Sequence, residues 1–180
     1  DMSGGLVVVT PSNVADRGIT WVGEQNNCTG VLTISGSAEF RTPRITMGVQ
    51  SGTTGTLNLN GGTLKTGAIT GGAGASNVTF NGTQIVATAD SAVFISGLTS
   101  ASIDAGGLPV DTAGFNLTAP QPISGVGGVV KAGAGRLVLG GTNTYTVDHV
   151  VLAGSLMISP WAVSPGDFTV SGGAAMGVLQ

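Results

Sequence analysis

Charged side chains are scarce in this chain. Its 180 residues include 6 Lys and Arg and 9 Asp and Glu, which is 8% of the total, for a formal net charge of -3. The charges stand singly, so there is no basic stripe that could neutralise the phosphates of a nucleic acid. The strong helix formers Glu, Lys and Arg are nearly missing. These shortages exclude nucleic acid as a partner and disfavour a helical fold.

Long apolar runs are also missing. A membrane-spanning helix needs roughly 18 or more apolar residues in a row, and the longest run, from Leu6 to Val9, is far shorter. We therefore expect no membrane insertion by this segment. The sequence opens at Asp1 without the basic and apolar regions of a secretory signal, so we expect any signal peptide to have been removed or to lie outside the segment.

A second cysteine is absent, so Cys28 cannot form an internal disulfide. A single thiol is compatible with an exported protein, and we interpret Cys28 as a small buried apolar residue. Glycine is abundant at 32 residues but follows no strict triplet, and there are only 7 prolines, which excludes collagen and a proline-rich disordered tract. Ser, Thr and Asn mixed with Val, Ile and Leu are typical of short strands joined by tight turns, so an all-β fold is predicted.

A short pattern, apolar-x-apolar-x-Gly, recurs seven times. The copies are Leu32, Ile34, Gly36; Leu57, Leu59, Gly61; Val78, Phe80, Gly82; Ile103, Ala105, Gly107; Leu137, Leu139, Gly141; Val150, Leu152, Gly154; and Phe168, Val170, Gly172. The first four glycines lie 25, 21 and 25 positions apart, by subtraction of 36, 61, 82 and 107. This spacing predicts a parallel β-helix with rungs of roughly 21–25 residues, rather than propeller blades of roughly 40–50. Alternating apolar residues should point inward, glycine should turn the chain with a positive φ, and Thr and Asn should form outer ladders.

One segment carries a more specific signature. Residues 128–159 contain Lys131, Gly133, Gly135, Leu137, Leu139, Gly141, Asn143, Thr144, Tyr145, Thr146, Ala153, Gly154, Ser155 and Leu156. In this order and spacing they resemble the autotransporter-associated β-strand repeat of type V secreted passenger domains. Ser155 stands where that family usually has Thr, and Val147, Asp148 and His149 replace its usual Gly and Thr residues. The resemblance implies a right-handed parallel β-helix (a β-solenoid) that is secreted or displayed on the cell surface of a Gram-negative-type bacterium.

Three regions are expected along the chain. Residues 1–29 form an irregular N-terminal rung or cap, residues 30–127 loosely repeated rungs, and residues 128–180 the autotransporter-associated rungs, truncated at the C-terminal end. The last copy runs into Ala174 to Leu179 without polar capping residues. We therefore expect an open end that continues into further rungs or self-associates with another copy.

Candidate catalytic residues are few. His149 beside Asp148, with Ser155 nearby, is a conceivable triad, but neighbouring strand residues point to opposite faces. We interpret His149 as an exposed corner residue and expect no enzyme activity. Asp90, Asp104 and Asp111 fall at different places in the repeat and are interpreted as turn or capping residues, and no acid is expected to stack on Glu39.

Ligand-binding residues stay unassigned, and no cofactor or metal is expected. The glycine-rich stretch Gly71 to Ser76 lacks the Asp of calcium-binding repeats and is interpreted as a turn. Lys65 and Lys131 are interpreted as rung-edge residues that discourage strand addition. Trp21, Trp161 and Tyr145 could stack on sugar rings, although Tyr145 belongs to the repeat corner.

These observations favour a non-catalytic structural role: a rigid stalk or filament segment in adhesion or self-association, with a surface glycan or host-cell molecule as partner. The first alternative is a β-helix protein that binds or cleaves polysaccharide, such as a phage tailspike. An ice-binding solenoid is a third hypothesis, for which Thr142, Thr144 and Thr146 supply a single row of alternate threonines.

Overall fold

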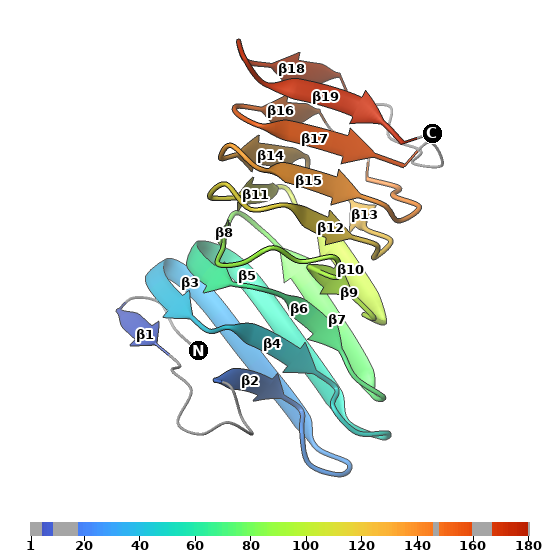
Figure 1. Ribbon diagram of the computed structural model, residues 1–180. Coiled ribbons are helices and arrows are strands. Elements are labelled where there is room, and N and C mark those ends of the chain that lie inside the picture. The colour runs from blue at the N-terminus through green and yellow to red at the C-terminus, as the bar shows by residue number, and fades with distance from the viewer. Residues whose placement is uncertain (1–4, 9–17, 146–147, 160–166, 180) are drawn as a thin grey trace.

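The computed structural model of the chain shows a coil of short strands stacked in successive turns, from the N-terminal end at the bottom of Figure 1 to the C-terminal end at the top. It describes residues 5–8, 18–145, 148–159 and 167–179. Within these residues every strand pairing is parallel and all regular structure is strand, as the sequence predicts. In this described part, no helix long and apolar enough to cross a bilayer occurs.

The strands form three parallel sheets. Sheet 1 contains β1 (Leu6–Val8), β3 (Thr29–Arg41), β5 (Thr54–Thr66), β7 (Ala75–Phe80), β8 (Gln84–Ala87), β10 (Ser100–Ile103), β11 (Leu108–Asp111), β13 (Ser124–Gly125), β14 (Val129–Ala132), β16 (His149–Val151) and β18 (Phe168–Val170). Sheet 2 contains β2 (Ile19–Val22), β4 (Arg44–Met47), β6 (Ile69–Gly71) and β9 (Ile95–Ser96). Sheet 3 contains β12 (Leu117–Ala119), β15 (Arg136–Leu139), β17 (Ser155–Ile158) and β19 (Ala175–Val178).

The core consists of rows of side chains that stack along the coil axis. One inward row contains Phe40, Leu64, Ile85, Val110, Lys131 and Val151, which are all at most 5% exposed, and Val170 in β18 continues its register but is 43% exposed. A second row contains Ile34, Leu59, Phe80 and Ile103, which are all at most 1% exposed. Because each rung covers the apolar side chains of the next, the coil has one continuous core.

Rung length changes along the chain. Thr29 pairs with Thr54, 25 positions later, and Leu57 pairs with Val78, 21 positions later. Towards the C-terminus the rungs are shorter than predicted: Leu137 pairs with Leu156 and His149 with Phe168, each 19 positions later.

The repeat pattern predicts where strands and turns occur better than it predicts which side chains point into the core. Five of the seven repeat glycines, Gly36, Gly61, Gly82, Gly107 and Gly154, have the predicted positive φ, between 62° and 101°, whereas Gly141 and Gly172 do not. In the fourth copy, however, Ile103 stacks on Phe80 and not on Val78, so this copy is two residues out of register. In the sixth copy the phase is reversed. Leu152 is 49% exposed, and Val151 points inward in its place.

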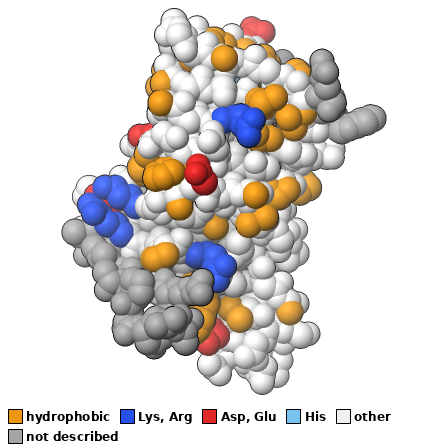
Figure 2. Space-filling model, in the orientation of Figure 1, with side chains coloured by type: hydrophobic (Ala, Val, Ile, Leu, Met, Phe, Trp, Pro, Cys, Tyr) orange, Lys and Arg blue, Asp and Glu red, His pale blue; other side chains and the backbone are white. Residues whose placement is uncertain are grey.

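Polar ladders cover the outer face of sheet 1, as predicted. Asn58 donates to Thr33 (3.3 Å), Asn81 to Asn60 (3.4 Å), and Ser100 to Asn77 (2.7 Å), each time between adjacent rungs. On the face seen in Figure 2, the charged side chains of the described residues form only a few separate patches among uncharged atoms. Uncharged hydrogen-bonding groups therefore supply much of the polar surface.

Candidate functional site

The corner between sheets 1 and 2 changes shape at the third rung. In the first two rungs the chain turns this corner in two residues, since β3 ends at Arg41 and β4 begins at Arg44, and β5 ends at Thr66 and β6 begins at Ile69. In the third rung β8 ends at Ala87 and β9 begins at Ile95. Before the corner, Thr66 of the second rung pairs with Ala87 of the third, 21 positions later in the sequence. After the corner, Ile69 pairs with Ile95, 26 positions later. Five extra residues thus lie within the segment 88–94, which we call the corner loop.

One edge of the corner loop is anchored to the following rung. Ser91 forms a parallel bridge with Leu117, and its amide donates to the Asn116 carbonyl at 3.0 Å. The Asn116 amide in turn donates to the Asp90 carboxylate at 2.6 Å. Phe94 closes the loop with a fully buried ring. These contacts fix the position of the corner loop on the coil. We call the part of this loop that lines the adjoining hollow, Thr88 and Ala89, the overhang.

The other edge of the corner loop lies over a hollow, which we call the corner cleft. It has a volume of about 430 Å³ and is lined by Arg41, Thr42, Pro43, Lys65, Gly67, Thr88 and Ala89. A second hollow of about 520 Å³ shares Pro43, Gly67 and Ala89 with it and extends to Ile19, Arg44, Ala68, Asp90, Ser91 and Val93. Each volume lies within the roughly 300–1,000 Å³ of small-molecule sites.

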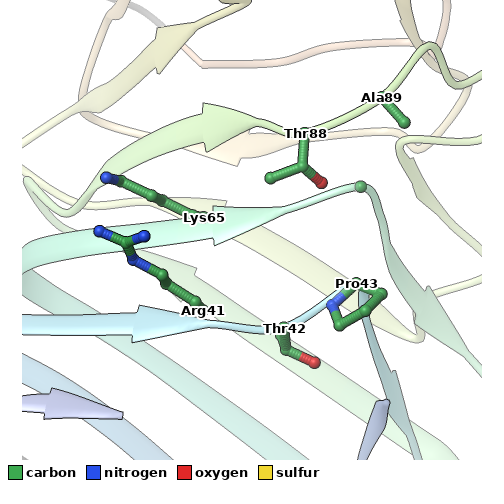
Figure 3. Close-up of a pocket in the computed structure, with 7 residues that line it drawn as sticks. Arg41, Thr42, Pro43, Lys65, Thr88 and Ala89 are labelled. Atoms are coloured by element: carbon green, nitrogen blue, oxygen red, sulfur yellow. The ribbon is translucent and has the colours of Figure 1, made fainter. Parts of the chain in front are cut away.

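Basic residues gather at this corner. Arg41 and Lys65 extend side by side from neighbouring strands, with their charged ends pointing away from Thr88 and Ala89 (Figure 3). Glu39 accepts hydrogen bonds from Arg41 Nε and from Lys65 Nζ, the latter at 3.2 Å. The hydrogen bonds from Arg41 and Lys65 lower the pKa of the Glu39 carboxyl below its ordinary value. Two cations thus share one carboxylate, which leaves a net positive charge at this end of the cleft.

Lys131 lies inside the coil, contrary to the prediction of a rung-edge residue. It belongs to the inward row between Val110 and Val151 and is fully buried. Its ammonium donates to the carbonyl oxygens of Ala132 (2.8 Å), Gly133 (2.8 Å) and Ala153 (3.1 Å). The side chain thereby satisfies turn carbonyls that face the interior. Burial lowers the pKa of Lys131 to about 8, while the charge of Asp111 opposes this change.

His149 is also buried, so its interpretation as an exposed corner residue is wrong. Its ring packs against Tyr145 edge to face, with centroids 5.2 Å apart, and stacks on Phe168 at 4.7 Å. Burial lowers the pKa of His149 and raises the pKa of the Tyr145 hydroxyl. Asp148 points to solvent and accepts a hydrogen bond from the Asp167 amide at 2.8 Å. The rings form an internal stack that packs the corner.

The candidate triad is not assembled. His149 lies in β16 of sheet 1, whereas Ser155 lies in β17 of sheet 3. Asp148 is exposed while His149 is buried, which confirms that the two neighbours face opposite sides.

The other predicted turn and capping residues are placed as follows. Asp111 accepts from the Ala113 amide at 2.7 Å and Asp90 from that of Asn116, which confirms their capping roles, and Asp104 lies in the turn after β10. Glu39 lies beside Thr63 of the next rung. Of the stretch Gly71 to Ser76, which was predicted to be a turn, only residues 72–74 lie between the strands, because Gly71 ends β6 and Ala75 and Ser76 begin β7. No group of three or more potential metal-ligating side chains occurs among the described residues.

The remaining candidates are scattered. Trp21 is 41% exposed on the outer face of β2, where it lies beside Thr46, and Tyr145 is fully buried. Trp161 lies outside the described residues. Cys28 is half-buried in the turn before β3, which corrects the prediction of a buried residue.

Two buried side-chain amides lie at the corner where the chain passes from sheet 3 back to sheet 1. Gln121 accepts from the Leu98 amide at 2.8 Å and donates to the Leu98 carbonyl at 3.1 Å. Asn143 accepts from the Ile123 amide at 3.0 Å. Each amide reaches back to the preceding rung and satisfies backbone that a strand ladder leaves unpaired.

Sequence reasoning missed the corner cleft altogether. Arg41 and Lys65 are 24 positions apart and become neighbours only through the register of β3 and β5. The one signal in the sequence was that three of its 6 basic residues, Arg41, Arg44 and Lys65, fall within 25 positions. These three line the two hollows. Comparison of the chain with protein families, with curated proteins and with solved structures finds no match.

Proposed function

We propose that this chain is a rigid, non-catalytic segment of an exported β-solenoid protein of the autotransporter passenger type, which acts as a spacer or filament in adhesion. The observation that carries the proposal is the continuous core, which runs from Val22 in β2 to Ile158 in β17 through every intervening rung. A coil of this kind transmits force along its axis through stacked backbone ladders.

The residues of the autotransporter-type signature have matching structural roles. Lys131 binds turn carbonyls, Asn143 caps the backbone of the rung below it, and Tyr145 packs against His149. Lys131 and Asn143 each join a corner to a neighbouring rung, through the Ala153 carbonyl and the Ile123 amide, whereas Tyr145 packs its own corner. A sequence repeat whose distinctive residues stabilise corners is what a structural module requires.

Self-association through the coil end belongs to the same proposal. β18 and β19 are the last described strands of their sheets, and Val170 (43% exposed) and Val178 (52% exposed) lie on them. An apolar strand edge favours parallel pairing with a further strand, and a second copy of the chain can supply one.

Single-molecule stretching tests the spacer role. The chain is placed between two reference domains and pulled from its ends. We expect it to resist as a cooperative unit and to rupture in one or two large steps, because the rungs share a core. Gradual unravelling of single rungs at low force would contradict the proposal.

A further inference from the structure

We infer that the corner cleft binds a saccharide that bears a carboxylate or sulfate group. The inference goes beyond the spacer role and does not depend on it. It rests on three observations: the cleft is preformed, cationic side chains lie at one end of it, and the rest of its lining is uncharged.

The cleft is preformed. Its floor consists of the two-residue corners at Pro43 and Gly67, which are held by the parallel ladders of β4 and β6. The Gly67 amide donates to the Pro43 carbonyl at 2.9 Å, which locks the two corners together. Its overhang is fixed to the next rung through Asp90 and Ser91. A ligand therefore binds without first ordering a loop, which removes one cost of association.

The charges favour an anion. Arg41 uses Nε for Glu39, and among the described residues no hydrogen bond occupies its two terminal nitrogens. The Lys65 ammonium shares the same carboxylate oxygen and has further protons to donate. A guanidinium and an ammonium side by side match a carboxylate or sulfate, which both can approach with charge-assisted hydrogen bonds. Arg44 adds a third cation in the adjoining hollow.

The body of the cleft is uncharged. The aliphatic stems of Arg41 and Lys65, the Pro43 ring and Ala89 supply apolar surface, and Thr88 adds a hydroxyl. A sugar ring has the same mixture, with C–H groups on its faces and hydroxyls at its edge. A volume of about 430 Å³ holds a ligand of a few rings at most. A nucleic acid would require a longer basic track than these residues supply.

Titration calorimetry on the folded chain tests the inference with four probes: a heparin-derived tetrasaccharide, tetragalacturonate, the neutral maltotetraose and inorganic sulfate. We expect binding of one or both acidic saccharides, which distinguishes sulfate from carboxylate recognition, and weaker binding as salt increases. Equal binding of the neutral sugar, or of inorganic sulfate, would overturn the inference.

Three variants assign the binding to the cleft. Arg41→Gln and Lys65→Gln should each weaken binding about tenfold, because each removes a charged donor. Glu39→Gln should tighten binding several-fold, because it releases both cations from their shared carboxylate, and a misfolded variant would not bind more tightly. Arg136→Gln removes an exposed arginine of sheet 3 and is the matched control that should change nothing. Unchanged affinity in all three cleft variants would overturn the inference.

Discussion

Replacement of Lys131 by Met tests whether the buried ammonium stabilises the coil. Met keeps much of the apolar stem but removes the donor that the carbonyls of Ala132, Gly133 and Ala153 share. The Ala132 carbonyl keeps the Thr112 amide (3.0 Å) and hydroxyl (3.1 Å) as donors. The carbonyls of Gly133 and Ala153 lose the ammonium as a donor, and each loss should lower the free energy of unfolding by about 1–3 kcal/mol.

Burial of the ammonium opposes this loss, because a charge taken out of water is unfavourable. We therefore expect the free energy of unfolding of Lys131→Met to fall by about 2–4 kcal/mol, below the sum for two unpaired carbonyls. The matched control is Lys65→Met, which removes a partly exposed lysine paired with Glu39 and should cost about 0.5 kcal/mol or less. Urea denaturation followed by circular dichroism measures both, with the slope checked for constancy.

The pH dependence gives an independent measure of the same site. Burial lowers the pKa of Lys131 from 10.5 to about 8, so between these values the unfolded chain binds more protons than the folded one. The contribution of Lys131 to stability should therefore rise with pH from about 8 to about 10.5, and Lys131→Met should abolish that rise. Equal losses in Lys131→Met and Lys65→Met, with no difference in pH dependence, would refute the reasoning.

Three further predictions follow from other parts of the molecule. Burial lowers the pKa of His149, so acidification through its ordinary value of 6.5 should destabilise the coil, and His149→Phe should reduce the fall in melting temperature between pH 8 and pH 5. Purified protein should release no product from polysaccharides, esters or peptides, and turnover that His149→Ala or Asp148→Ala abolishes would show that an active site exists. Light scattering should detect self-association at high protein concentration, and Val178→Lys combined with Leu179→Lys should reduce it; equal masses for both proteins would exclude the coil end as the contact.

Local pattern was sufficient to predict the class of fold. Alternating apolar residues such as Leu57 and Leu59, followed by Gly61, define a strand and its turn from neighbouring positions alone. The repeated spacing then requires that the strands stack in parallel, because a short rung buries its apolar face only against another rung. The capping role of Asp111 could be predicted for the same reason, since a short acidic side chain in a turn bonds to backbone two residues on. Asp90 instead caps the amide of Asn116, 26 positions along the chain, which only the stacking of rungs brings near.

The side on which a residue lies was decided by tertiary structure. In the segment from His149 to Leu152 apolar residues occupy both alternating sets of positions, so the sequence is compatible with either face. Pairing with β14 and β18 places His149 and Val151 inside and leaves Leu152 exposed. A shift of one residue exchanges the two faces of a strand, and only the neighbouring rungs select between them.

The corner cleft depends on tertiary structure still more strongly. Arg41 and Lys65 meet because the rung between them has 24 residues, and the overhang exists because the next rung has five extra residues at the corner. Neither length follows from any local propensity. The sequence by itself determined that the chain coils in parallel rungs, whereas the register between rungs decided which side chains face the core and which converge on the surface.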